Sequence, residues 1–117
     1  MRFEIEFYKK ENNEKPVEIL LDSVSEKVRA KIIDNIVLLR DNGSTVREPK
    51  SKHIDDGIFE LRTQLGSTAS RILYFFFVGR RIILTNGFIK KTQKTPIDEI
   101  EKAKEYRKRY IERKNRK

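Results

Sequence analysis

The sequence contains no cysteine, a single histidine and only five glycines. Without cysteine the chain can form neither a disulfide framework nor a thiolate site. With His53 as the only imidazole, it cannot supply the ligands of a structural zinc site or an arguable Ser-His-Asp triad. The glycines are scattered, so the sequence has neither a P-loop nor a dinucleotide-binding fingerprint. Several common catalytic classes are therefore excluded.

Long hydrophobic runs are also missing. No apolar stretch approaches the roughly 20 residues that a membrane helix needs. The N-terminal segment "MRFEIEFYKK" alternates apolar and polar residues and lacks the apolar core of a signal peptide. The absence of cysteine is compatible with a reducing compartment. These features predict a soluble, cytoplasmic protein with no membrane contact.

Positive charge is what the sequence has in excess. A chain of 117 residues is long enough for one hydrophobic core and too short for two, so we expect a single domain over 1–117 whose last few residues are frayed. The net charge is +9, and residues 88–117 carry +7 of it, with 12 basic and 5 acidic residues. Such a segment favours phosphate groups or an acidic protein partner. A solvated basic helix that keeps the protein soluble explains the charge about equally well.

Periodicity in the N-terminal half predicts one strand followed by two helices. Residues 3–7 alternate as a half-buried strand. Pro16 is suited to the first position of a short helix, and Ser25 to the cap of a second one that ends at 41–43. Residues 44–57 are predicted to form a polar loop.

The C-terminal half predicts an antiparallel meander and a last helix. Its strands are expected at 58–62, 70–78 and 81–88, the second of them covered on both faces because it is continuously apolar. Thr95 is predicted to cap the final helix, with Pro96 at its first position. The apolar seam of that helix is predicted to contain Ile97, Ile100, Ala103 and Tyr110. The order β-α-α-β-β-β-α predicts an α+β fold.

Basic side chains gather at the strand ends of this predicted meander. Arg62 ends one strand and Arg71 begins the next, and the third strand returns to the same edge. Such a cluster can cradle a phosphodiester with a stacked base. The candidate residues are Arg62, Arg71, Lys90, Lys91 and Lys94, with Lys52 in the preceding loop, Phe88 or Tyr74 as the stacking ring, and Glu60 as the one nearby carboxylate considered as a base.

These candidates have plainer alternatives. Arg62 can pair with Glu60 at the surface, and Arg71 can extend its charge to solvent beside a buried strand. Tyr74 lies within "ILYFFFV", where core packing is favoured by roughly two to one over a stacking role. His53 lies in a charged segment and is expected to be an exposed bystander.

Four segments, "DGIFELR", "SRILYFFF", "TNGFIKKTQKTP" and "IDEIEKAKEYRKRY", together resemble the HigB-like, phage-derived branch of the RelE/ParE toxin superfamily. The resemblance covers residues 38–110. Its motif order is specific: a Glu-Leu-Arg strand, an Arg-x-x-Tyr strand, then Gly-Phe-x-Lys-Lys before a proline and a Glu-rich helix. It implies an N-terminal strand and αα-hairpin packed on an antiparallel-dominated sheet, with a C-terminal helix.

The resemblance implies a type II toxin that cleaves mRNA on the ribosome until an antitoxin with a helix-turn-helix DNA-binding domain neutralises it. No cofactor or metal takes part: the ribose 2′-hydroxyl attacks the adjacent phosphate and the 5′-oxygen leaves. Arg71 then falls at a phosphate-binding position, Arg62 at the Glu-Leu-Arg arginine, and Lys90 and Lys91 at catalytic or RNA-contacting positions. Some relatives use a histidine or tyrosine near the last strand as the acid. This sequence has neither there, so a lysine or substrate positioning must serve.

Two other functions remain open on this scaffold. ParE-like relatives inhibit DNA gyrase by binding, without nuclease activity. The lysine pair and the arginines favour cleavage, because inhibition of gyrase needs no convergent cations, but a scaffold alone does not decide function. A basic RNA- or DNA-binding module without catalysis is the residual alternative.

Overall fold

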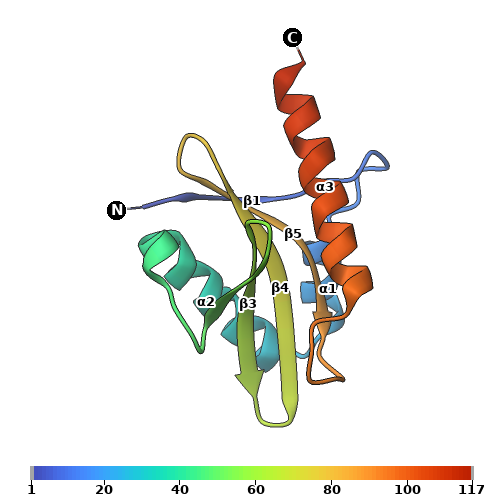
Figure 1. Ribbon diagram of the computed structural model, residues 1–117. Helices are drawn as coiled ribbons and strands as arrows, with labels where there is room; N and C mark the ends of the chain where they lie inside the picture. The colour runs from blue at the N-terminus through green and yellow to red at the C-terminus, as the bar shows by residue number, and fades with distance from the viewer. Residues whose placement is uncertain (1, 117) are drawn as a thin grey trace.

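The structure, a computed structural model, describes residues 2–116 as a five-stranded sheet with helices on both faces (Figure 1). The sheet has the order β1-β5-β4-β3-β2, with β1 parallel to β5 and all other neighbours antiparallel. The predicted α+β class and antiparallel-dominated sheet are confirmed. The elements are β1 (Glu4–Phe7), α1 (Pro16–Ser23), α2 (Glu26–Asn42), the 3-10 turn η1 (Gly43–Thr45), β2 (Ser51–Asp55), β3 (Ile58–Leu65), β4 (Thr68–Phe77), β5 (Arg81–Ile89) and α3 (Ile97–Asn115).

Strand β4 lies at the centre of the sheet and contributes to two hydrophobic clusters. Ile72 and Tyr74 pack in the cluster that contains the buried residues of α1 and α2. Leu73 and Phe75 pack on the other face with those of α3. Because both faces are covered, the strand is apolar at nearly every position, as the sequence predicts. No helix within residues 2–116 has the length and hydrophobicity to cross a membrane.

Both predicted ends of α2 are confirmed. The Ser25 hydroxyl caps the helix by accepting a hydrogen bond from the Val28 N–H at 3.2 Å. At the other end Gly43 has a φ of 54°, a conformation that favours glycine, and a Cβ there would collide with the Phe3 ring. The end of α2 is thereby packed directly against Phe3, the residue that precedes β1.

The prediction of a loop over residues 44–57 is wrong in part, because β2 lies within it. This strand pairs with β3 at the edge of the sheet. Ser51 is its only fully buried residue, so it shows no apolar alternation. Its pairing partner lies in β3, and residue patterning within the segment does not reveal it.

The start of α3 also differs from the prediction. The helix begins at Ile97 after Pro96 and has no side-chain cap; the Thr95 hydroxyl bonds to Glu60 instead. Ile97 is 73% exposed and does not belong to the apolar seam, whereas Ala103 is buried as predicted. The helix continues to Asn115, through most of the segment expected to fray, and Lys117 lies outside the described residues. Its last turns project beyond the sheet (Figure 1).

Candidate functional site

Arg62, Arg71 and Phe88 form a row across three adjacent strands. Arg62 pairs with Arg71 between β3 and β4, and Arg71 pairs with Phe88 between β4 and β5. Residues directly opposite each other share one face of a sheet, here the face covered by α3. The N–H of Lys90 bonds to the carbonyl of Ala69 at 2.7 Å, which extends the ladder by one more residue. By alternation Lys90 shares the face of Phe88, so the structure brings these residues together.

A buried carboxylate lies beneath the two arginines. Glu60 is 2% exposed, and its Oε1 accepts a hydrogen bond from Arg62 Nε at 2.8 Å and lies 3.6 Å from Arg71 Nε. Its Oε2 accepts a hydrogen bond from the Thr95 hydroxyl at 2.5 Å. A buried charge requires such partners in place of water. Arg62 does pair with Glu60, but the carboxylate of this pair is buried rather than at the surface. Both of its oxygens are engaged by protein groups and are not offered to RNA.

Arg71 is itself 8% exposed, which is unusual for an arginine. Burial lowers the pKa of Arg71, the Glu60 carboxylate opposes that shift, and the positive charge of Arg62 adds to it. The guanidinium stays protonated even so, because arginine is not deprotonated in proteins. Its Nη1 donates to the Ser70 carbonyl at 2.9 Å. Two guanidinium groups around one carboxylate leave a net charge of +1 at this point of the sheet.

The predicted lysines lie on two sides of the arginine pair. Lys52 is exposed on β2 and pairs in register with Glu60, so it shares the face of the arginines. Lys90 is half-buried, and Lys91 and Lys94 are exposed in the segment between β5 and α3. Near the end of that segment, the Thr95 hydroxyl donates a hydrogen bond to the buried Glu60 carboxylate. The same carboxylate therefore contacts both the arginines and the segment that carries three lysines.

Tyr74 is not brought to this site. It lies on the opposite face, 1% exposed, with its ring stacked on Phe59 at 5.5 Å between centroids. Its hydroxyl shares a hydrogen bond with Ser51, and burial raises the pKa of the Tyr74 phenol. The structure thus places Tyr74 in the hydrophobic core, the alternative that the sequence favoured over a stacking role. Phe88 remains as the ring within the row, half-buried and packed against the cluster below α3.

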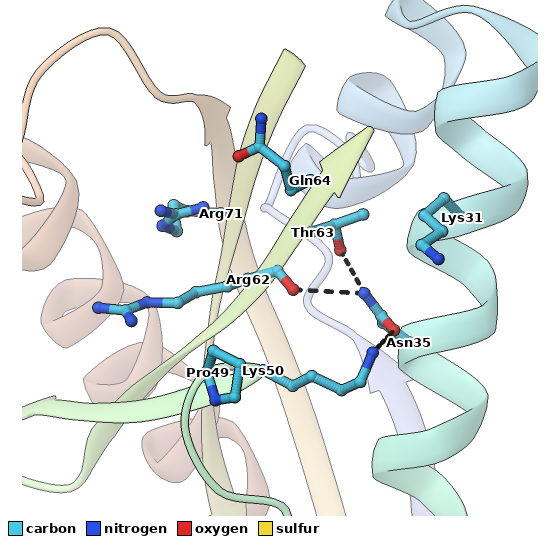
Figure 2. A pocket seen from close by; sticks show the side chains of 8 residues that line it. All are labelled: Lys31, Asn35, Pro49, Lys50, Arg62, Thr63, Gln64 and Arg71. Atoms are coloured by element: carbon cyan, nitrogen blue, oxygen red, sulfur yellow. Dashed lines mark hydrogen bonds between the residues drawn. The ribbon is translucent and has the colours of Figure 1, made fainter. Parts of the chain in front are cut away.

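A groove of about 400 Å³ crosses the edge of β3 where β2 no longer pairs with it (Figure 2). Its floor lies between β3 and α2, and Figure 2 shows Arg62 and Arg71 on one side of β3 with Lys31 and Asn35 on the other. Four cations and no carboxylate line the groove. The lining residues are Lys31, Asn35, Pro49, Lys50, Arg62, Thr63, Gln64 and Arg71.

Asn35 joins the two sides of this groove and was missed by sequence reasoning. It is 5% exposed, and its amide donates to the carbonyl of Arg62 at 3.3 Å and to the Thr63 hydroxyl at 2.9 Å. Its Oδ1 accepts from Lys50 Nζ at 3.4 Å. A sequence signal existed: Asn35 interrupts the apolar stripe of α2, and a buried amide requires hydrogen-bonding partners. No comparable signal marks Lys31, Lys50 or Thr95.

The single histidine lies apart from these groups. His53 is exposed on β2, its ring meets that of Phe59 edge-on, and its Nε2 accepts a hydrogen bond from the Gly57 N–H at 3.1 Å. The structure therefore agrees with the expectation of an exposed residue. Within residues 2–116, no three histidine, aspartate or glutamate side chains gather in a group that could hold a metal ion.

Comparison with known proteins gives one family. A family model described as "phage derived protein Gp49-like (DUF891)" matches residues 20–108. This range contains the row of Arg62, Arg71 and Phe88, the buried Glu60 with its partner Thr95, and every residue that lines the groove. No curated protein is significantly similar to the chain. Since the match spans well over half of the sequence, the chain belongs to the phage-derived, Gp49-like family.

Proposed function

We propose that this protein is the toxin of a type II toxin–antitoxin pair, an endoribonuclease that cleaves translated mRNA on the ribosome and arrests growth until a helix-turn-helix antitoxin binds it. Membership of the Gp49-like family and the motif resemblance support a toxin. The observation that supports a nuclease is that Arg62 and Arg71 share one buried carboxylate at the end of a groove whose charged lining residues are all cations. Inhibition of gyrase by binding needs no such arrangement.

The proposed reaction is transfer of a phosphodiester within the RNA. The ribose 2′-oxygen attacks the adjacent phosphorus as its proton passes to a base, and the bond to the 5′-oxygen breaks as that oxygen takes a proton from an acid. The products are a 2′,3′-cyclic phosphate and a 5′-hydroxyl end. The transition state carries two negative charges, which pre-placed cations stabilise. Arg71 and Arg62 are suited to bind the non-bridging oxygens, since a guanidinium can donate two parallel hydrogen bonds.

The groups that could transfer protons are those whose donor or acceptor atoms are not already engaged within the protein. Glu60 has both oxygens engaged, so we assign it to positioning rather than to proton transfer. Lys90 and Lys91 follow Phe88 at the end of β5 and are assigned to the leaving oxygen. Imidazole is the side chain best suited to proton transfer near pH 7, and His53 lies outside the site. Orientation of the substrate must therefore supply much of the rate, which favours mRNA held by the ribosome.

Primer extension on mRNA from cells expressing the chain tests this function. We expect cuts within translated regions, no cuts in the same transcript with its start codon removed, and no cuts with Arg71→Ala. Growth arrest without new RNA ends would contradict the nuclease and leave inhibition of gyrase as the better account.

A further inference from the structure

The groove across the edge of β3 extends the cationic site away from the lysines that follow β5. Arg62 and Arg71 lie at one end of it, while Lys50 and Lys31 lie toward α2 (Figure 2). Arg62 has a second acidic neighbour besides Glu60, the 65% exposed Glu48 at 3.7 Å, which lies outside the lining of the groove. Pro49 is the only apolar residue in the lining. The groove therefore suits a polyanion rather than an apolar ligand.

Lys50 is held in place before any ligand arrives. Its ammonium group lies 3.4 Å from Asn35 Oδ1, and Asn35 is in turn fixed by Thr63 and by the Arg62 carbonyl. A lysine that is already ordered loses less conformational entropy on binding than a free one. Lys31 stands one helical turn before Asn35 on α2 and is exposed. The two ammonium groups thus flank one buried amide.

The backbone of β3 is open at the same place. The Arg62 N–H bonds to the Lys50 carbonyl at 2.7 Å, and this is the last contact across that edge. Alternation along an antiparallel strand directs the N–H and C=O of Gln64 to the same side as those of Arg62. The N–H and C=O of Gln64 can therefore hydrogen-bond to a base of a single nucleic-acid strand or to the backbone of an extended peptide. A peptide adding to the edge would also need pockets for its side chains, and the polar lining offers none.

On the basis of the function proposed above, we propose that Lys31 and Lys50 form a second phosphate subsite for the RNA strand. It binds the phosphodiester next to the one held by Arg62 and Arg71. The strand then crosses the sheet from the lysines after β5, over β4 and β3, onto α2. Single-stranded RNA is the ligand because the subsite neutralises backbone phosphates one after another and leaves the bases free to turn outward.

The test measures binding apart from cleavage. A short single-stranded RNA with 2′-O-methyl riboses cannot be cut, because it has no 2′-hydroxyl nucleophile, and its affinity can be followed by fluorescence anisotropy over a range of salt. Removal of two phosphate contacts with Lys31→Gln/Lys50→Gln should reduce the log–log salt slope by about 1.4, or about 0.7 for each contact. Lys31→Gln alone, which leaves the buried amide untouched, should reduce it by about half as much.

The matched control is Arg2→Gln/Lys9→Gln, which removes the same charge from exposed positions on either side of β1, at the edge of the sheet opposite the groove. Its slope should stay close to that of the wild type. An unchanged slope for the groove variants, or an equal loss in the control, would overturn the subsite. Primer extension reports separately on the nuclease: binding that depends on the groove in a protein that makes no cuts would uphold the subsite and reject the proposed function.

Discussion

Glu60 Oε1 accepts a hydrogen bond from Arg62 Nε at 2.8 Å, in a position where the glutamate is 2% exposed. Arg71 Nε lies 3.6 Å from the same oxygen. Without the carboxylate, two guanidinium groups facing each other across β3 and β4 would repel one another. The buried Glu60 carboxylate therefore holds both guanidinium groups in place. Its own burial is in turn stable only while the arginines are there to pair with it.

Glu60→Gln should accordingly damage both fold and activity. The amide keeps the shape but leaves the guanidinium groups without a counter-charge, so we expect stability to fall by about 3 kcal/mol. Toxicity should fall as well. The control is Glu48→Gln, which removes an exposed partner of Arg62 at 3.7 Å and should cost well under 1 kcal/mol. Denaturant unfolding of both variants checks this; equal stability of the two would mean that the burial of Glu60 is unimportant.

Arg71→Ala should abolish most of the cleavage. Loss of one pre-placed cation at a developing phosphate charge costs roughly 2–4 kcal/mol of barrier, about two to three orders of magnitude in rate. Lys91→Ala should act in the same direction with the fold intact, because the side chain is exposed. His53→Ala should have little effect. Single-turnover cleavage of ribosome-bound mRNA measures all three. Loss of activity in His53→Ala with full activity in Arg71→Ala would place the site elsewhere.

The exposed charges of α3 should serve ribosome docking rather than folding. Lys102 and Lys108 are exposed, and replacing both by Gln should leave the melting temperature nearly unchanged. The salt dependence of ribosome binding should become flatter, by up to about one unit of log–log slope for each lost phosphate contact. A slope equal to that of the wild type would show that the helix makes no contact with ribosomal RNA.

Arg113 on the same helix should behave differently. Arg113 donates to the Lys9 carbonyl at 2.6 Å and lies 5.0 Å from the centre of the Tyr8 ring. Arg113→Gln should therefore lower stability by about 1 kcal/mol through the lost cation–π and hydrogen-bond contacts. Chemical denaturation checks this, with Lys108→Gln as the control at an exposed position of the same helix.

A contact between α3 and β2 should depend on pH. Lys104 Nζ lies 2.6 Å from Asp55 Oδ2, and this hydrogen bond holds the pKa of Asp55 below its ordinary value of 3.8. A depressed carboxyl pKa contributes stability that is present above the ordinary pKa and is lost as the pH falls through the folded one. Lys104→Gln should thus lower the melting temperature at pH 7, and its effect should shrink progressively as the pH falls below 3.8. A deficit that persists undiminished in acid would exclude this ion pair as its cause.

The elements with regular patterns could be predicted, and the exceptions have physical reasons. The Ser25 cap, the stop at Gly43 and the doubly covered β4 are local or periodic signals, and all are observed. Strand β2 has almost no buried side chain of its own, so only its partner in β3 makes it a strand. Thr95 has the features of a cap, but its hydroxyl donates to the buried Glu60 carboxylate. A hydrogen bond to this charged acceptor is stronger than the neutral one that the hydroxyl oxygen would accept from a helix N–H.

The site could be predicted only where neighbouring strands set it. Arg62, Arg71 and Phe88 meet because a meander with short turns fixes its own register. The exclusion of Tyr74 follows from alternation, since it is one residue out of phase with the arginine face. Lys31 and Lys50 come from different segments: the packing of α2 brings Lys31 to β3, and the pairing of β2 brings Lys50 there. No pattern within either segment contains that information.

The most direct test of the central claim uses purified ribosomes paused on a defined mRNA, with naked mRNA and a gyrase supercoiling assay in parallel. The wild-type protein should cut the ribosome-bound message, leave a 5′-hydroxyl end, cut naked RNA far more slowly and leave supercoiling unchanged. Arg71→Ala should bind the ribosome and cut at a rate lower by about two to three orders of magnitude. Intact ribosome-bound mRNA at protein concentrations that block supercoiling would contradict the account.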